Sequence, residues 1–260
     1  MSPTHHDSKS FKQPDAAPDA DRDNNMHAAP ASNAQDGQPN GERPNNGQSD
    51  NGQSDSGERN LAGAKHYALG RLEQELPERF GYHSLEHTRD NVYPIALRIA
   101  ALEGVSGRAL YLLKTAIYFH DLGFSEPPHT AQNHEERSAA IAQQVLVNFG
   151  YSNDDITLIK GMILATKLPQ QPKTLLERII ADADLSVLGQ RDFLKQNRAL
   201  RAELESGGMD TDDHRWLTGQ YNFLSGHRYF TRAARQLLSA QKAVNLASLR
   251  TLIDELSEAS

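Results

Sequence analysis

The dipeptide His120-Asp121 constrains this chain most, because it stands at the end of the apolar run 109–119. Apolar side chains in that run recur three to four residues apart, the spacing typical of a buried helix. A buried ionised carboxylate is unfavourable unless a cation or hydrogen bonds compensate its charge. A divalent metal ion compensates it well, and Gly123 indicates that the helix stops just after the pair. The run therefore predicts a helix that carries an imidazole and a carboxylate into the interior.

Two other segments provide metal-binding side chains that helices can bring to the same point. His83 and His87 stand four residues apart, so they lie on one face of a helix. Asp182 and Asp184 end a further apolar helix. The 260 residues include no cysteine, so any metal must be held by histidine, carboxylate and water.

The ordered set His87, His120-Asp121 and Asp184 resembles the HD-domain superfamily of metal-dependent phosphohydrolases, and the resemblance covers residues 80–190. It implies that these four residues ligate a divalent metal ion, with Mn, Mg, Ni, Co, Zn and Fe all open. Asp184 is chosen over Asp182 because its flanking residues match the last-ligand segment of the cyclic-nucleotide phosphodiesterases in this superfamily. Whether one or two metal ions bind is left open.

Shorter segments refine the resemblance. Residues 82–87 are similar to the opening motif of the cyclic-nucleotide phosphodiesterases, with Ser84 where those enzymes have Asn. Segments 134–139, 165–167 and 182–189 look closer still to a bacterial branch of predicted HD phosphohydrolases. The resemblance therefore implies a hydrolase that cleaves either a phosphomonoester or a phosphodiester bond in a nucleotide or a similar small phosphorylated molecule.

The implied reaction is attack of metal-bound hydroxide on phosphorus, so we place Asp121 in the catalytic set as well as in the ligand set. His83 matches the general acid of the phosphodiesterases and would protonate the leaving oxygen. The alternative for His83 is a hydrogen-bonded loop histidine. A second class of function is a metal-stabilised regulatory or ligand-binding module with little turnover, and oxygenase chemistry at two irons is a third.

Four further residues are candidates for substrate or metal support, each with two readings. His134 and Glu135 either help to bind a second metal or the substrate, or lie at the surface near a helix start. Lys167 either holds a substrate phosphate or compensates the dipole at the end of a helix. Asp182 either orients a ligand histidine or is solvated.

The expected fold is all-α, a single HD-type helical domain over residues 61–260, preceded by a disordered tail over residues 1–60. Before Leu61 the chain has no Val, Ile, Leu, Tyr or Trp, so it cannot bury enough surface to offset its ordering entropy. Pro94 should kink the second helix, since it removes one hydrogen bond. Capping patterns predict three later helix starts. They are Asn133–Glu136, Ser152–Asp155 and Thr174–Glu177.

Charge and hydropathy limit the partners. The chain carries −7, and residues 1–60, with 10 acidic and 5 basic side chains, account for −5 of it. The remainder is nearly neutral, so we expect no nucleic-acid partner. With no long apolar run and no signal-peptide core, we expect a cytoplasmic protein without membrane contact. The sequence does not indicate an oligomeric state, and His227 reads as a surface or core histidine.

Overall fold

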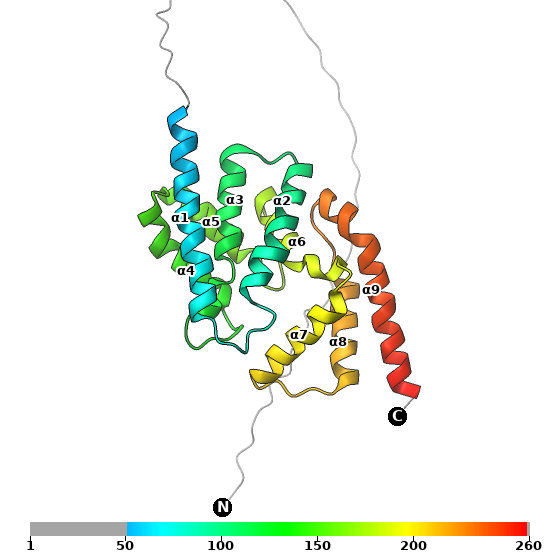
Figure 1. The fold of residues 1–260 in the computed structure, drawn as a ribbon. Helices are drawn as coiled ribbons and strands as arrows, with labels where there is room; N and C mark the ends of the chain where they lie inside the picture. The colour runs from blue at the N-terminus through cyan, green and yellow to red at the C-terminus, as the bar shows by residue number, and fades with distance from the viewer. Residues whose placement is uncertain (1–50, 259–260) are drawn as a thin grey trace, which may run out of the picture. The chain divides into compact units, whose positions relative to one another are not determined.

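The computed structural model describes residues 51–258, with side chains from Asn60 onward (Figure 1). Residues 1–50, most of the predicted tail, lie outside this described part. The first helix begins at Asn51, ten residues before the predicted start at Leu61. Extending an existing helix adds one hydrogen bond for each residue that it fixes, so polar residues can lengthen it without burial. The apolar residues from Leu61 onward therefore predicted where α1 begins to pack against the core, and not where the helix itself begins.

The all-α prediction is confirmed: the described residues form helices joined by loops, and none of them forms a strand. None of the described helices combines the length and apolar character needed to cross a membrane. The described residues 51–258 lie in one compact unit, and their action as a single HD-type domain stays a prediction. The α-helices are α1 Asn51–Glu75, α2 Tyr93–Leu102, α3 Gly107–Phe119, α4 His134–Val145, α5 Asn153–Leu164, α6 Leu175–Asp184, α7 Phe193–Ser206, α8 Asp213–Gly226 and α9 Arg232–Glu258.

Helix α3 lies at the centre of the larger hydrophobic core, where it packs against α1, α5 and α6. Leu113, Ile117 and Phe119 are completely buried, as the spacing predicts. Burying a large apolar side chain of this kind contributes about 1.5–3 kcal/mol. The end of α3 is therefore held firmly by its own packing.

A smaller core joins the C-terminal helices to the turn that follows α6. It contains Leu188, Phe193, Leu224 and Leu249. Helices α8 and α9 pack side by side (Figure 1). The buried amide of Asn245 donates hydrogen bonds to two carbonyl oxygens of the turn, at 2.8 and 2.9 Å. The C-terminal helices are thereby fixed to the segment that carries the predicted ligand on α6.

The predicted capping boxes are confirmed at two of the three helix starts. Ser152 with Asp155, and Thr174 with Glu177, satisfy each other's backbone donors at the starts of α5 and α6. The prediction is wrong for Asn133, whose side chain caps nothing because its backbone is left-handed, with φ of 58°. An N-cap side chain needs an extended backbone to reach the first turn.

The segment predicted as the second helix is irregular before Pro94, where a π-helical turn occupies His87–Val92, and the predicted kink stays a prediction. Regular α2 follows, and Pro94 stands in its first turn. A proline is tolerated there because the first backbone donors of a helix have no partner within it. The wider turn immediately precedes α2 and begins at His87, one of the predicted ligands. Such π-turns are frequent at functional sites.

Candidate metal centre

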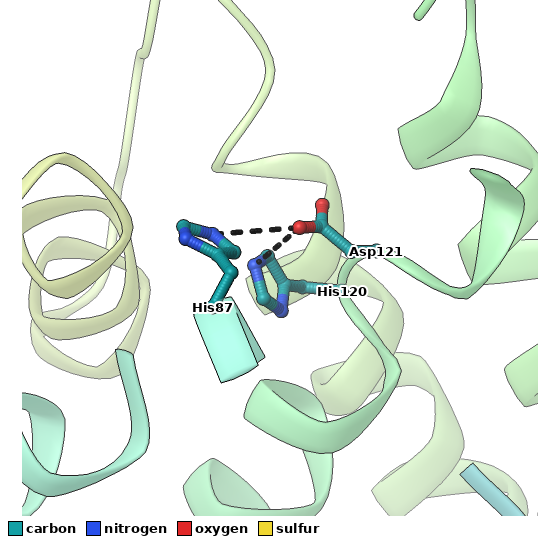
Figure 2. A group of neighbouring side chains, drawn as sticks. All are labelled: His87, His120 and Asp121. Carbon is teal, nitrogen blue, oxygen red and sulfur yellow. Dashed lines mark ion pairs between the residues drawn. The ribbon is translucent and has the colours of Figure 1, made fainter. Parts of the chain in front are cut away.

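His87, His120 and Asp121 converge at one point, where their ligand atoms all lie within 4.8 Å of one another (Figure 2). The Oδ2 atom of Asp121 lies 3.2 Å from Nε2 of His120 and 3.5 Å from Nε2 of His87. All three side chains are buried. Two imidazoles and a carboxylate in this arrangement form a donor set suited to a divalent metal ion.

The backbone fixes the orientation of His120. Its Nδ1 donates a hydrogen bond to the carbonyl oxygen of Ile117, at 2.8 Å, one turn back in α3. This bond places the proton on Nδ1 and leaves the lone pair of Nε2 facing Asp121. The structure thus presents His120 in the tautomer that a metal ligand requires.

Asp184, at the end of α6, contacts both histidines. Its Oδ1 lies 3.3 Å from Nε2 of His87 and 3.5 Å from Nε2 of His120. Burial alone would raise the pKa of Asp184, but the two histidines outweigh that effect and lower the pKa to about 2. Asp184 is therefore ionised and adjacent to the three-residue group, and its role as the fourth ligand stays a prediction.

Two buried atoms of this centre fit a bound cation. Nε2 of His120 and Oδ2 of Asp121 have no hydrogen-bond partner among the described residues. Buried polar atoms without partners are unusual and call for an explanation. A divalent ion coordinated by both atoms supplies one, so the residues present fit the metal that the sequence predicts.

His83 lies beside the centre and is held by a residue that the sequence did not indicate. Its Nδ1 donates a hydrogen bond to Oε1 of Glu203, at 2.5 Å, and its ring centroid lies 5.9 Å from that of His87. Oε2 of Glu203 accepts from the backbone N–H groups of Tyr82 and His83, at 2.9 and 3.0 Å. Burial would raise the pKa of Glu203, but these hydrogen bonds, led by that of His83, lower it. Glu203 is thus an ionised partner that orients His83.

Nothing in the sequence pointed to Glu203, since it lies in α7, among residues that read as packing elements, 120 positions after His83. Phe124 was missed for the same reason. Its ring stacks on both His83 and His134, with centroids 4.3 and 4.2 Å apart. Only the folded chain brings these groups together.

His134 lies at the edge of the centre, with Nε2 3.4 Å from Oδ1 of Asp121. Its Nδ1 donates to the carbonyl oxygen of Ala131, at 2.9 Å. Burial would lower the pKa of His134, but the Asp121 carboxylate outweighs it and the pKa is raised. Glu135 is buried and contacts His134 at 3.3 Å, away from the three-residue group. Support of a second metal or of substrate stays a prediction for both residues.

Lys167 pairs with Glu136, and its Nζ also lies 3.4 Å from Oδ1 of Asn133. Its charge is thus matched by a carboxylate on α4, so a role in holding substrate phosphate stays a prediction. Arg137 donates three hydrogen bonds to backbone carbonyl oxygens of the loop before α4 and of Gly123. Its guanidinium stabilises this loop and forms no ion pair with Glu136 or Asp121 in the described part.

Asp182 matches neither of its predicted readings. It is completely buried, and its Oδ1 accepts from the backbone N–H of Phe230 at 2.7 Å. Its Oδ2 accepts from the N–H and the hydroxyl of Thr231, at 2.8 and 2.7 Å. It therefore contacts no ligand histidine and is not solvated. Periodicity could not show this, because the partners lie 48 and 49 residues further along the chain.

Gly123 allows the turn after Asp121 to approach α4, and we expect Gly123→Ala to destabilise the protein. A Cβ atom there would lie 2.0 Å from the carbonyl oxygen of His134, a contact that the backbone can relieve only by moving. We expect the free energy of unfolding to fall by about 1–3 kcal/mol in urea denaturation. The matched control is Gly70→Ala in α1, where a Cβ meets nothing within 4 Å. That control should raise stability slightly, and equal losses in both variants would contradict the close approach.

His227 lies at the end of α8, apart from the proposed ligands, and it predicts a pH dependence. Burial, then the charges of Lys242 and Arg228, lower its pKa to about 4. The folded protein resists a protonation that the unfolded chain accepts. The contribution of neutral His227 to the free energy of unfolding should therefore be fully present above about pH 6.5 and be lost as the pH falls towards 4. The expected loss is roughly 2–3 kcal/mol.

Urea denaturation at pH 7 and pH 4.5 measures this contribution. His227→Gln should remove it, whereas His66→Gln, at an exposed position of α1, should leave the wild-type pH dependence unchanged. The same pH dependence in wild type and His227→Gln would show that other groups carry it.

Part of the chain is similar to a known protein family. Residues 84–186, which include all four predicted ligands, match the family model described as HD domain. This match identifies residues 84–186 as an HD domain, in line with the resemblance in the sequence. No curated protein matches the chain.

Two solved structures are similar in fold. One is a predicted HD superfamily hydrolase from an uncultured Thermotogales bacterium, with 16% identity and a TM-score of 0.50 over 74% of this chain and 92% of that chain. The other is a protein from Lactobacillus plantarum, with 16% identity and a TM-score of 0.57 over 76% of this chain and 97% of that chain. At this level of identity, the likeness concerns the fold.

Proposed function

We propose that this protein is a metal-dependent phosphohydrolase that cleaves a phosphomonoester or phosphodiester bond in a nucleotide or a similar small phosphorylated molecule. The observation that carries the proposal is the convergence of His87, His120 and Asp121, with two buried ligand atoms that lack a partner. A divalent cation held there lowers the pKa of a bound water and polarises a phosphoryl oxygen.

The residues of the chain account for orientation and proton transfer. His87, His120, Asp121 and Asp184 would hold the cation. His83 would give a proton to the leaving oxygen, because its Nδ1 is engaged by Glu203 while its Nε2 makes no hydrogen bond within the described part. An acid whose ring is fixed from one side delivers its proton in a defined direction. Glu203 acts as a positioning residue.

A small cleft beside the centre has a polar lining, and its volume of about 10 Å³ is roughly that of one water. Its lining includes Asp184 and His87, together with the amides of Asn91, Gln190 and Gln196. No Lys or Arg is among its described lining residues. Amide groups donate and accept hydrogen bonds without adding charge. These amides can hydrogen-bond a water or a small polar group of a substrate beside the proposed metal centre.

Hydrolysis of p-nitrophenyl phosphate and bis(p-nitrophenyl) phosphate with added Mn²⁺, Mg²⁺, Ni²⁺ or Co²⁺ tests the reaction class. We expect metal-dependent release of nitrophenol from at least one of them, and loss of both metal and activity in His87→Ala. A screen of nucleotides and cyclic nucleotides then identifies the substrate class. Metal binding without hydrolysis of any of these compounds would instead support a metal-stabilised regulatory module.

A further inference from the structure

A second cavity of 240 Å³ lies between α8 and α9, and the proposed hydrolysis does not use it. This volume far exceeds the about 10–15 Å³ that one water needs on the same measure. We propose that the cavity is a binding site for a small organic anion, in which a carboxylate or phosphate-type oxyanion is attached to an apolar body. The proposal is independent of the proposed reaction.

The positive charge of the lining carries the first step. Arg228, Arg235 and Lys242 all line the cavity, and no carboxylate is among its described lining residues. The sequence has neither Asp nor Glu from position 214 to position 253, so the parts of the two helices that line the cavity supply no counter-charge of their own. Asp182, which approaches from α6, directs its oxygens to the backbone of Phe230 and Thr231. Its charge acts on Arg235, but among the described residues no carboxylate forms an ion pair with Arg235, Arg228 or Lys242. The cationic lining, Arg228 and Lys242 above all, is therefore left for an anion from outside the chain.

The two arginines of the lining also keep N–H groups that are free to bind an anion. Nη1 of Arg228 donates to the carbonyl oxygens of Ser225 and His227, at 3.0 and 3.3 Å. Nη1 of Arg235 donates to those of Tyr229 and Phe230, at 2.9 and 2.8 Å. Each guanidinium is thus anchored through one nitrogen, and its other N–H groups have no hydrogen-bond partner in the described part. A planar fork held in this way is suited to an oxyanion.

Two further groups in the cavity lack a hydrogen-bond acceptor or a compensating negative charge. Both ring nitrogens of His227 are buried without a hydrogen-bond partner among the described residues. An imidazole N–H left unpaired in this way is unfavourable, and a ligand oxygen would accept from it. Lys242 donates to the carbonyl oxygen of His227, while burial, followed by the charge of Arg228, lowers its pKa to about 8. A bound anion would relieve this repulsion.

The rest of the wall is apolar, which determines the body of the ligand. Leu224 of α8 is completely buried, and Ala243 and Leu246 line the same cavity from α9. The ring of Tyr229 lies 5.7 Å from Nζ of Lys242. A flat hydrocarbon group fits beside these side chains, whereas a bare inorganic ion would leave them hydrated. Benzoate and phenylphosphonate are therefore suitable probes.

Titration of the full-length protein with benzoate, phenylphosphonate and neutral benzamide tests the site, with the ring signals of His227 followed by NMR. We expect at least one anion to bind at least tenfold more tightly than benzamide, and to raise the pKa of His227. The stronger of the two probes identifies the oxyanion as carboxylate or phosphate-type. Binding of benzamide as tightly as both anions, or no saturable response of His227 to either anion, overturns the proposal.

Variants locate the contact. Lys242→Met, which keeps the apolar stem, should weaken anion binding by roughly 10- to 100-fold, the usual worth of a hydrogen bond to a charged group. The matched control is Arg232→Gln, which removes the same charge from α9 at a position that does not line the cavity. Arg228→Gln, at an exposed position, repeats the test if Lys242→Met does not fold. Equal weakening by control and cavity variants overturns the proposal in favour of a general charge effect.

Discussion

His83→Ala is expected to lower turnover by roughly 10²–10⁴-fold while metal content stays near wild type, because a positioned general acid contributes about that much. His83 lies beside the centre without being part of the three-residue ligand group, and Glu203 holds it 2.5 Å from a carboxylate oxygen. Its removal should therefore affect proton transfer and leave coordination intact. Metal analysis of the purified variant, together with kcat for a substrate with a poor leaving group, measures both effects.

The leaving group provides the control for this prediction. Nitrophenol departs without needing a proton, so the loss in His83→Ala should shrink on nitrophenyl substrates. Glu203→Gln keeps an acceptor near Nδ1 but removes its charge, so it should give a smaller loss and shift the pH profile of kcat. His87→Ala should lose metal and turnover together. Equal losses of His83→Ala on good and poor leaving groups, or metal loss in that variant, would assign His83 to substrate binding or to the metal shell.

Asp182→Ala should lower the free energy of unfolding by roughly 2–5 kcal/mol, since it leaves two backbone N–H groups and a hydroxyl without their acceptor in a buried place. The hydroxyl of Thr231 in turn accepts from the N–H of Ala234 in the first turn of α9, at 3.1 Å. The network thus continues from α6 into the start of the last helix. Denaturant unfolding measures the loss, and hydrogen exchange at Phe230 and Thr231 should accelerate most.

Asp182→Asn is the matched control, because it keeps one of the two acceptor oxygens at nearly the same volume. We expect it to lose less stability than Asp182→Ala and to protect at least one of the two amides. If both variants unfold like wild type, the network contributes little and α9 is held by its apolar face alone.

Local signals in the sequence predicted what depends on neighbouring residues. The spacing in 109–119 predicted the buried helix α3, because a helix repeats its environment every three to four residues. The pairs Ser152–Asp155 and Thr174–Glu177 predicted two helix starts for the same reason. Asn133 shows the limit of such signals, since the chain there takes a left-handed turn that the spacing of Asn133 and Glu136 does not encode.

Contacts between distant residues could not be predicted in this way. The sequence supplied His83 and the four proposed ligands through a resemblance, but Glu203 and Phe124 had no pattern that tied them to the centre. Asp182 has the same limitation, because its partners start a helix nearly fifty residues later. The local sequence pattern around a carboxylate at the end of an apolar helix is the same whether the carboxylate binds a metal or caps another helix. Only the packing of α6 against α9 separates Asp182 from Asp184.

The contact between His83 and Glu203 determines what is transferred when a segment of this chain is moved into a related protein. The segment matched by the HD model, 84–186, includes all four proposed ligands but neither member of that contact. A chimera that inherits only this segment would receive the proposed ligands without the proposed proton donor. Exchange of α7 between relatives would instead change the residue that orients His83 and leave the proposed ligands in place. If His83 is the donor, metal affinity and catalytic rate would be separable properties that different stretches of the chain can acquire independently.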